Sequence, residues 1–398
     1  MSTRSTEVTY SGEMKPLFKL AFMTGLLTVV TLGIYRFWAK TRIRKYLWSS
    51  AGIDGDRFEY TGTGLEKFLG FLVAVVLLAI YLGIVQLVLT YFGLGLVLQP
   101  TTQAEAIAQI LSIYISLFAV FPFMLFATYR AQRYRLARTR FRGIRFGMDS
   151  AAWGYAFRAM GYYLLVILTL GILMPLASFK LSKFMTDRSW YGDAKFEQTG
   201  KWTALYPPML HLLIGVIILI AAIFLAETSE FSWFSVLLLI VGYIWMIFGL
   251  LYYNIRSFVY LMNNMTLASD VTFTARASVK TVLLRAFGGI LLVGIIAIAG
   301  FALLGVVGSY LSYMLGSSTE MTMGQILLIA FIVLAYMALL IALGALSLVF
   351  ITQPILAHLL NTLEIGNAEV LANVQQRAHD KGADAEGFAE ALDIGGAI

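Results

Sequence analysis

Residues 20–46 read LAFMTGLLTVVTLGIYRFWAKTRIRKY, and residues 158–184, at an offset of 138 positions, read RAMGYYLLVILTLGILMPLASFKLSKF. Both stretches are apolar runs that pass through the same Thr-Leu-Gly-Ile sequence and end in basic residues. The match continues downstream at the same spacing, which predicts an internal duplication. The equivalent pairs include Gly33 and Gly171, Glu59 and Glu197, and Thr61 and Thr199.

The composition around this repeat indicates a membrane as the solvent. Of the 398 residues, 60% are apolar and 13% are charged, whereas a soluble protein carries about 25% charged residues. The charges fall in clusters between long apolar runs, which excludes a disordered chain, a fibrous repeat and a coiled coil. Cysteine is absent, which excludes disulfides, thiolate metal sites, iron–sulfur clusters and cysteine nucleophiles.

Six apolar stretches exceed the roughly 20 residues that a spanning helix needs. They lie between Lys67 and Glu105, Glu105 and Arg130, Lys201 and Glu227, Glu230 and Arg256, Arg285 and Glu320, and Glu320 and Glu364. The two duplicated runs are weaker, because one is short and the other contains Gly171 and Pro175. We therefore expect an all-α polytopic protein with about six transmembrane helices. Segments 20–38 and 159–179 are expected to be re-entrant or interfacial, and eight helices result if both cross.

Lysine and arginine set the orientation, because they accumulate in cytoplasmic loops. Four loops are rich in lysine and arginine: residues 39–67 contain six of them, residues 130–158 eight, residues 180–201 five and residues 256–285 four. The connections around Glu105, Glu227 and Glu320 have none. If the two weak segments do not cross, every basic loop and both termini are cytoplasmic. If both cross, two basic loops lie on opposite faces.

The repeat divides the chain into five expected parts. They are a cytoplasmic N-terminal segment 1–19, a first membrane repeat 20–157, a second repeat 158–285, a helical hairpin 286–363 and a cytoplasmic acidic tail 364–398. The repeats are parallel if the weak segments return, and inverted if they cross. Short strands are expected at residues 143–146 and 271–273.

One block of the first copy combines glycine, aromatic and basic residues, namely Thr31-Leu32-Gly33-Ile34-Tyr35, Trp38-Ala39, Arg42, Tyr46, Phe58, Tyr60 and Gly62-Thr63-Gly64. In this block the sequence resembles a known family, the YjgN-like bacterial inner-membrane proteins, whose function is unknown. The second copy departs from it, with Leu173 and Leu176 in place of Tyr35 and Trp38. The resemblance implies a bacterial inner (cytoplasmic) membrane and supplies no substrate or cofactor.

The sequence gives little support for catalysis. The three histidines, His211, His358 and His379, are far apart, and no hydrolase, metalloprotease or phosphate-loop motif occurs in a suitable context. We expect no enzyme activity, catalytic residue, cofactor or metal site. Both His211 and His358 are expected to be structural residues near the membrane surface.

Two basic clusters with interleaved aromatic residues are the candidate contact sites. Because they adjoin membrane segments, they favour anionic lipid headgroups over nucleic acid; a protein partner or a homo-oligomer stays open. The candidate lipid or partner contacts are Arg36, Trp38, Arg42, Arg44, Lys45, Arg133, Arg135, Arg138 and Arg140. The repeat-equivalent candidates are Gly33, Gly171, Glu59 and Glu197.

Two functions follow from these features. The first is transport or permeation of a small neutral or amphipathic solute, because no ionisable residue falls in the middle of a secure span and Gln86 and Asn254 can line a path. The alternative is a membrane scaffold that does not transport, and that recruits a protein or organises anionic lipid.

Single-cysteine labelling from outside intact cells tests the orientation without removal of a native cysteine. Ser50, Thr102, Ser150 and Ser189 are replaced by cysteine one at a time. We expect only Thr102→Cys to label with an impermeant maleimide, because it alone lies in a connection without basic residues. Labelling of Ser189→Cys with Ser150→Cys protected would show that segment 159–179 crosses.

Overall fold

The computed structural model describes residues 5–95, 100–227, 232–315 and 322–377. Several predictions fall outside these ranges, namely those on Glu230, Glu320, His379 and the acidic residues beyond Arg377.

Long apolar helices dominate the structure. The described ranges contain six helices long and apolar enough to cross a membrane, and they coincide with the six predicted spans, which are thereby confirmed as helices. At most 17% of the most apolar part of each is buried within the protein, so these helices leave most side chains for lipid. They are α3 Gly64–Tyr91, α4 Gln103–Ala137, α7 Tyr206–Ala226, α8 Ser232–Asn263, α9 Val279–Leu315 and α10 Met323–Ser347.

Shorter helices occupy the remaining apolar segments. They are α1 Met14–Val30, α2 Arg36–Ser49, α5 Ala152–Leu168, α6 Met174–Thr186 and α11 Gln353–Asn361. A π-helical turn, Leu348–Thr352, connects α10 to α11, and a 3-10 turn, Trp202–Leu205, precedes α7.

The expectation of an all-α protein is too narrow, because short antiparallel strands connect the helices. Each strand has only three to six residues, so its own alternation is too brief to distinguish it from a loop. The expected strands at 143–146 and 271–273 lie in β5 and β9. The described strands are β1 Ser5–Tyr10, β2 Ala51–Ile53, β3 Asp56–Tyr60, β4 Thr139–Phe141, β5 Ile144–Met148, β6 Ser189–Tyr191, β7 Ala194–Gln198, β8 Met265–Leu267, β9 Val271–Ala275 and β10 Leu363–Gly366.

The described residues fold as two compact units. One contains those of 59–273 and 366–377, and the other contains those of 5–58 and 274–365. In the first unit the antiparallel order is β4-β5-β6-β7-β8-β9, and in the second it is β10-β1-β2-β3. Helical hairpins connect strands that pair with each other, as α5–α6 does for β5 and β6. The residues of the hairpin turns are therefore remote in sequence from the strands.

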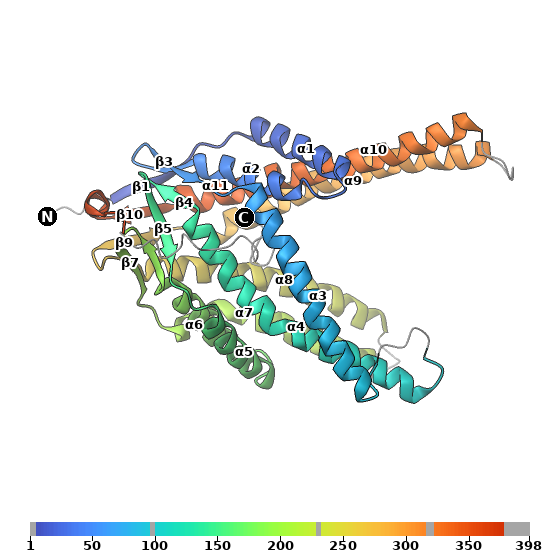
Figure 1. Cartoon of the computed structure of the whole chain (residues 1–398), viewed down its shortest axis with the longest axis horizontal. Helices are drawn as coiled ribbons and strands as arrows, with labels where there is room; N and C mark the ends of the chain where they lie inside the picture. Colours follow the sequence, from blue (N-terminus) through green and yellow to red (C-terminus); the bar gives the residue numbers. More distant parts are fainter. Residues whose placement is uncertain (1–4, 96–99, 228–231, 316–321, 378–398) are drawn as a thin grey trace. The chain divides into compact units, whose positions relative to one another are not determined.

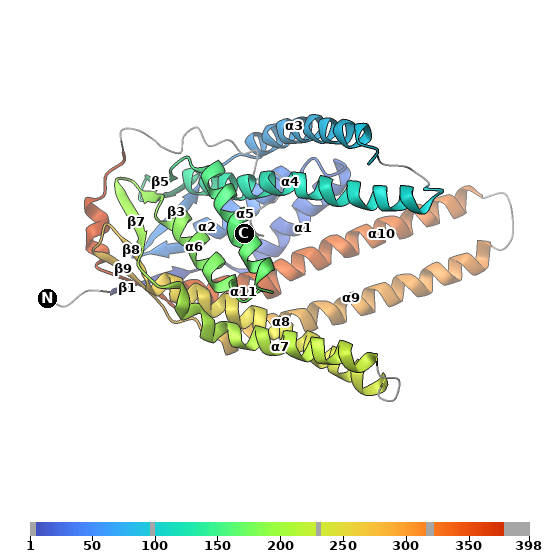
Figure 2. The same ribbon diagram turned by 90° about the horizontal axis from the view of Figure 1, so that it is seen from below.

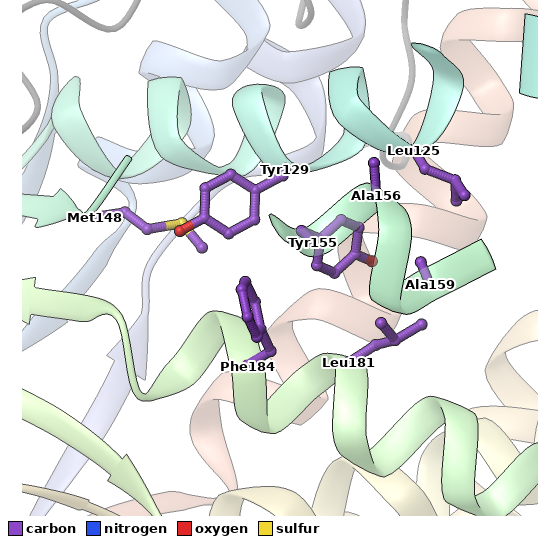
Figure 3. Close-up of a cluster of buried hydrophobic side chains, with 8 residues drawn as sticks. All are labelled: Leu125, Tyr129, Met148, Tyr155, Ala156, Ala159, Leu181 and Phe184. Carbon is purple, nitrogen blue, oxygen red and sulfur yellow. The ribbon is translucent and has the colours of Figure 1, made fainter. Parts of the chain in front are cut away.

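In the first unit, three helices and a strand enclose an aromatic core. Figure 3 shows Tyr129 of α4, Tyr155 of α5, Phe184 of α6 and Met148 of β5 converging on one another. Tyr129 lies 5.5 Å from Tyr155 between ring centroids. Burial raises the pKa of the Tyr155 phenol, with Tyr163 adding to the effect, so the ring stays neutral. This core fixes the α5–α6 hairpin against α4.

Close glycine contacts mark helix pairs in both units. In the first unit, α7 and α8 run side by side in Figures 1 and 2, and a Cβ at Gly215 would come within 2.7 Å of the Met246 nitrogen. In the second unit, a Cβ at Gly25 of α1 would meet Ile341 of α10 at 2.5 Å. Small residues let helix backbones approach closely in membranes, so these glycines serve packing.

The described start of the expected acidic tail is structured. Leu363–Gly366 forms β10, and a 3-10 turn follows at Ala368–Asn373. Asp193 binds Gln375 twice, since its N–H donates to the Gln375 carbonyl at 2.9 Å and its carboxylate accepts from the Gln375 N–H at 3.0 Å. The Arg377 guanidinium lies 3.5 Å from the Trp190 ring centroid. The tail thus docks on the β6–β7 hairpin.

A buried hydrogen bond holds α3 and α4 together near the strands. The hydroxyl of Tyr134, which is fully buried, donates to the Glu66 carboxylate at 2.8 Å, and Arg138 pairs with the same carboxylate at 3.1 Å. Glu66 itself is positioned by its N–H bond to the Thr63 hydroxyl at the start of α3.

We expect Tyr134→Phe to lower the free energy of unfolding by about 1 to 2 kcal/mol, because the buried tyrosine loses its hydrogen bond to a partly exposed carboxylate. The measurement is thermal unfolding in detergent, with Tyr163→Phe, a half-exposed tyrosine of α5, as the control. In a double-mutant cycle with Glu66→Gln, additive losses would show that the two side chains do not interact.

Candidate membrane-interface site

The two duplicated segments are helical hairpins. The chain reverses at residues 31–35 between α1 and α2, and at residues 169–173 between α5 and α6. Neither hairpin contains a helix of the length and hydropathy that a span needs. Figure 1 shows α5 and α6 side by side in one short hairpin.

The first turn satisfies its own backbone donors. Each N–H group from Thr31 to Tyr35 donates a hydrogen bond inside the hairpin. Four of these bonds go to backbone carbonyls, of which the shortest joins the Gly33 N–H to the Thr28 carbonyl at 2.7 Å. The Tyr35 N–H donates to the Thr31 hydroxyl at 2.9 Å. The turn therefore needs no water for these donors.

The second turn repeats this arrangement bond for bond. The Gly171 N–H donates to the Val166 carbonyl at 2.7 Å, and the Leu173 N–H donates to the Thr169 hydroxyl at 3.2 Å. The backbone also agrees, with φ of 93° at Gly33 and 91° at Gly171. Both glycines are at positive φ, where a side chain is strained.

The turns carry apolar side chains on their outer surface. Leu32 is 94% exposed and Leu170 is 91% exposed, and both have φ of 51°. A leucine in the left-handed region is uncommon, so the sequence keeps an apolar side chain at the tip at some conformational cost. Each hairpin thus ends in an apolar tip with satisfied backbone donors.

Basic side chains on α2 follow the first tip directly. Arg36, Arg42 and Lys45 are exposed, as expected for contacts with headgroups. Trp38 is half-buried and stacks on Tyr35 with ring centroids 6.1 Å apart. Arg44 is only 2% exposed and lies over the Trp48 ring, so it is not offered at the surface.

The second basic cluster is mostly engaged within the fold. Arg133 is 8% exposed and its Nε donates to the Met148 carbonyl at 3.1 Å. Arg135 donates to Gln132, one turn earlier on α4, and the Nε atom of Arg140 in β4 is buried.

Arg138 belongs to the network described above. Burial alone would lower the pKa of Arg138, yet the Glu66 carboxylate and the Tyr134 hydroxyl raise it above its ordinary value. Arg138 thus joins the ends of α3 and α4, and Arg133 joins α4 to β5.

The equivalent carboxylates lie on strands. Glu59 is the fourth residue of β3, Glu197 is the fourth residue of β7, and both are exposed. Neither carboxylate belongs to a hairpin turn, so the two kinds of repeat-equivalent candidates lie on different elements.

The two described histidines occupy packed positions. His211 of α7 faces the α8 rings of Trp245, Phe248 and Tyr252, and the Tyr252 centroid lies 4.6 Å away. His358 accepts a hydrogen bond at Nε2 from the Ser278 N–H at 3.1 Å, just before α9. Both contacts are those of structural residues.

The candidate contacts did not include Trp153, or Arg130 at the start of the predicted basic loop 130–158; both residues line a cavity where α4 ends its apolar run and α5 begins. The signal was present, because a tryptophan and an arginine at the edge of an apolar segment are typical of a membrane interface.

Gly171→Ala should lower the free energy of unfolding by about 1 to 2 kcal/mol, because alanine is strained at this positive φ. No atom would meet the added Cβ, so the effect isolates the backbone. Gly161→Ala in the interior of α5 is the control, and it should leave stability unchanged or raise it by about 0.5 to 1 kcal/mol. Equal effects in thermal unfolding would contradict the turn geometry.

Comparison with known proteins identifies relatives with a shared printed name. The chain is 26% identical over 156 residues to the inner membrane protein YjgN of Salmonella typhimurium, covering 37% of this chain and 33% of the relative. It is 23% identical over 172 residues to the protein of the same name from Escherichia coli O157:H7, covering 43% and 38%. The aligned part thus spans about a third of each relative. No solved structure matches significantly. Residues 5–295 match the family described as "Bacterial protein of unknown function (DUF898)", to which this chain belongs.

Proposed function

We propose that this chain is a bacterial inner-membrane scaffold that organises anionic lipid in the cytoplasmic leaflet. In this proposal the long apolar helices cross the bilayer, and the hairpins α1–α2 and α5–α6 enter the leaflet from the cytoplasm and return. Both termini and all basic loops are cytoplasmic. The names of the relatives support the inner membrane as the location.

The apolar tip with satisfied donors is the observation that carries the proposal. Irregular backbone costs several kcal/mol for each unsatisfied polar group in hydrocarbon. Both turns avoid this cost for their N–H groups. Backbone carbonyls accept from the first four N–H groups of each turn, and a threonine hydroxyl accepts from the fifth. In a loop that faces water, water molecules would satisfy these N–H groups. A leucine that is more than 90% exposed would not stabilise such a loop. The agreement between the turns also supports the duplication, with parallel repeats.

Helix length and charge limit the depth of insertion. With a rise of about 1.5 Å per residue, α6 extends about 20 Å, less than the roughly 30 Å hydrocarbon core. Lys180 is exposed in the middle of α6, at a distance from the tip that suits the headgroup region, whereas Lys183 pairs with Asp187 at 3.0 Å. In the first hairpin Arg36 directly follows the tip, so that hairpin is expected to sit more shallowly.

Lipid organisation follows from the apolar tips and their basic flanks. Basic residues near an anionic leaflet gain about 1 kcal/mol each, and Arg36, Arg42 and Lys45 are exposed for such contacts. The tips displace lipid in one leaflet only, while the basic side chains retain anionic headgroups around them. We also infer that the protein is not an enzyme.

Transport of a neutral or amphipathic solute, the other function favoured by the sequence, has less structural support. Gln86 of α3, a candidate for lining a path, donates to the Ser116 hydroxyl of α4 at 2.6 Å, and the fully buried Ser112 lies 3.5 Å from its oxygen. These are contacts of helix packing. Flux into liposomes across a panel of neutral metabolites would favour transport instead.

Spin labels at the tips test the insertion. Leu32→Cys and Leu170→Cys are labelled with nitroxide in bilayers containing phosphatidylglycerol, and oxygen and nickel-chelate accessibility gives their depth. Leu77→Cys in α3 serves as the lipid-facing control and Arg57→Cys in β3 as the water-facing control, since both residues are exposed. We expect both tips to lie below the phosphate level, with Leu170 deeper. Accessibility like that of Arg57→Cys would contradict the proposal.

A further inference from the structure

The end of the described chain contacts the β6–β7 hairpin in the way that a linear peptide contacts its receptor. After β10 and the 3-10 turn, residues 374–377 lie along the β6–β7 turn, and both belong to the first unit. We call residues 374–377 the tail segment. Its four consecutive residues each make a different kind of contact, either with the hairpin or with β5.

The first contact is an apolar side chain in a close fit. Val374 is only 9% exposed. A Cβ at Gly192, in the β6–β7 turn, would lie 2.8 Å from Val374 Cγ1 and would also meet the Gln375 carbonyl oxygen. Glycine at position 192 therefore makes the room that the tail segment occupies.

The second contact reads the backbone of the tail segment. The Asp193 N–H donates to the Gln375 carbonyl at 2.9 Å, and the Asp193 carboxylate accepts from the Gln375 N–H at 3.0 Å. The Gln375 side chain is exposed, so this position is recognised through its main chain. In the recognition of extended peptides, main-chain bonds supply affinity and pockets for side chains supply specificity.

The last two residues add side-chain contacts. The Gln376 side-chain oxygen accepts from the Arg145 N–H at 2.8 Å. The Arg377 guanidinium lies 3.5 Å from the Trp190 ring centroid, a distance at which the ring attracts a cation. The fitting pattern is thus a branched apolar residue, any residue with a free N–H, a glutamine and an arginine.

The docked tail orders more chain than its burial favours. Among residues 371–377, only Leu371 and Val374 are buried, whereas ordering the backbone costs conformational entropy at every residue. The docking is helped by the covalent connection to β10, which makes binding intramolecular and raises the effective concentration of the tail segment. A separate peptide with the same pattern is therefore a direct competitor for the same contacts.

We propose that the β6–β7 hairpin is a peptide-binding site, that the tail segment is its resident ligand, and that a partner protein presenting the same extended pattern displaces it. The inference goes beyond the organisation of lipid, because it gives the scaffold a site for a protein partner. It rests on contacts within the first unit and does not depend on the depth of the hairpin tips.

The test is fluorescence anisotropy of a labelled peptide with the sequence of residues 371–377, added to the full chain in detergent. Gln375→Pro in the chain releases the tail segment, because proline has no N–H for Asp193. The preceding Val374 has φ of −69° and ψ of 133°, a conformation that a following proline tolerates. Arg377→Glu is a second release variant, because a carboxylate replaces the cation over the Trp190 ring.

A matched pair of substitutions locates the bound peptide. In the Gln375→Pro chain, Asp193→Ala removes the acceptor of the peptide N–H at an exposed position. Asp270→Ala, at the exposed β8–β9 turn, makes the same change in charge and is the control. Its carbonyl, which accepts from the Asn367 amide at 2.8 Å, is retained. Thermal unfolding of each variant confirms that it is folded.

We expect both release variants to bind the peptide about tenfold more tightly than the unaltered chain, because the tethered competitor is gone. Adding Asp193→Ala to Gln375→Pro should weaken binding about tenfold, through loss of a hydrogen bond to a charged group, whereas Asp270→Ala should leave it unchanged. A peptide that itself carries Gln375→Pro should bind weakly to every form of the chain.

The inference is overturned if the folded release variants bind the peptide no better than the unaltered chain. Equal binding after Asp193→Ala and Asp270→Ala, or equal binding of the proline peptide, would overturn it as well. The spin-label depths keep the two proposals separable. Tips in water with the expected peptide binding would refute the proposed insertion alone, and inserted tips without peptide binding would refute the peptide site alone.

Discussion

The hydrogen bonds that close the two hairpin turns are the constraint on which the rest of the structure depends. An apolar segment in a bilayer must either cross as a continuous helix or reverse with its backbone groups satisfied. Here it reverses, because glycine takes a positive φ and a threonine hydroxyl accepts the N–H four residues later. With the reversal, both ends of each hairpin return to strands that pair with each other. The basic loops can then share one face of the membrane.

That arrangement explains why many basic residues lie inside the fold rather than on an open surface. Arg133 joins α4 to β5 through the Met148 carbonyl, and Arg138 joins α4 to α3 through the Glu66 carboxylate. In the proposed topology the same residues also mark the cytoplasmic side. Arg36, Arg42 and Lys45 of α2 are exposed, and the proposal assigns contact with lipid headgroups to them.

The sequence predicted the long helices best, because a bilayer sets the minimum length of an apolar helix that crosses it. The long apolar runs were confirmed as helices, because few other structures accommodate so many apolar residues in a row. The strands could not be predicted as a set, since Met265–Leu267 is defined by pairing with Phe196–Gln198, and even the nearest pair, Gln198 and Met265, is 67 positions apart in sequence. In the candidate site, the sequence named Gly33 and Gly171 as equivalent residues but not as the turn positions, and the burial of Arg44 and Arg133 was not foreseen. Residue type indicates a headgroup contact, but the direction in which a helix faces is set by tertiary packing.

The position of the bilayer around the whole protein tests this account most directly. Electron cryo-microscopy in nanodiscs containing phosphatidylglycerol would show the phosphate level of each leaflet relative to the hairpins. The account predicts that Leu32 and Leu170 lie just below the phosphates of one leaflet, with the strands outside that same leaflet. A hairpin tip in bulk water, or one that reaches the opposite leaflet, would contradict it.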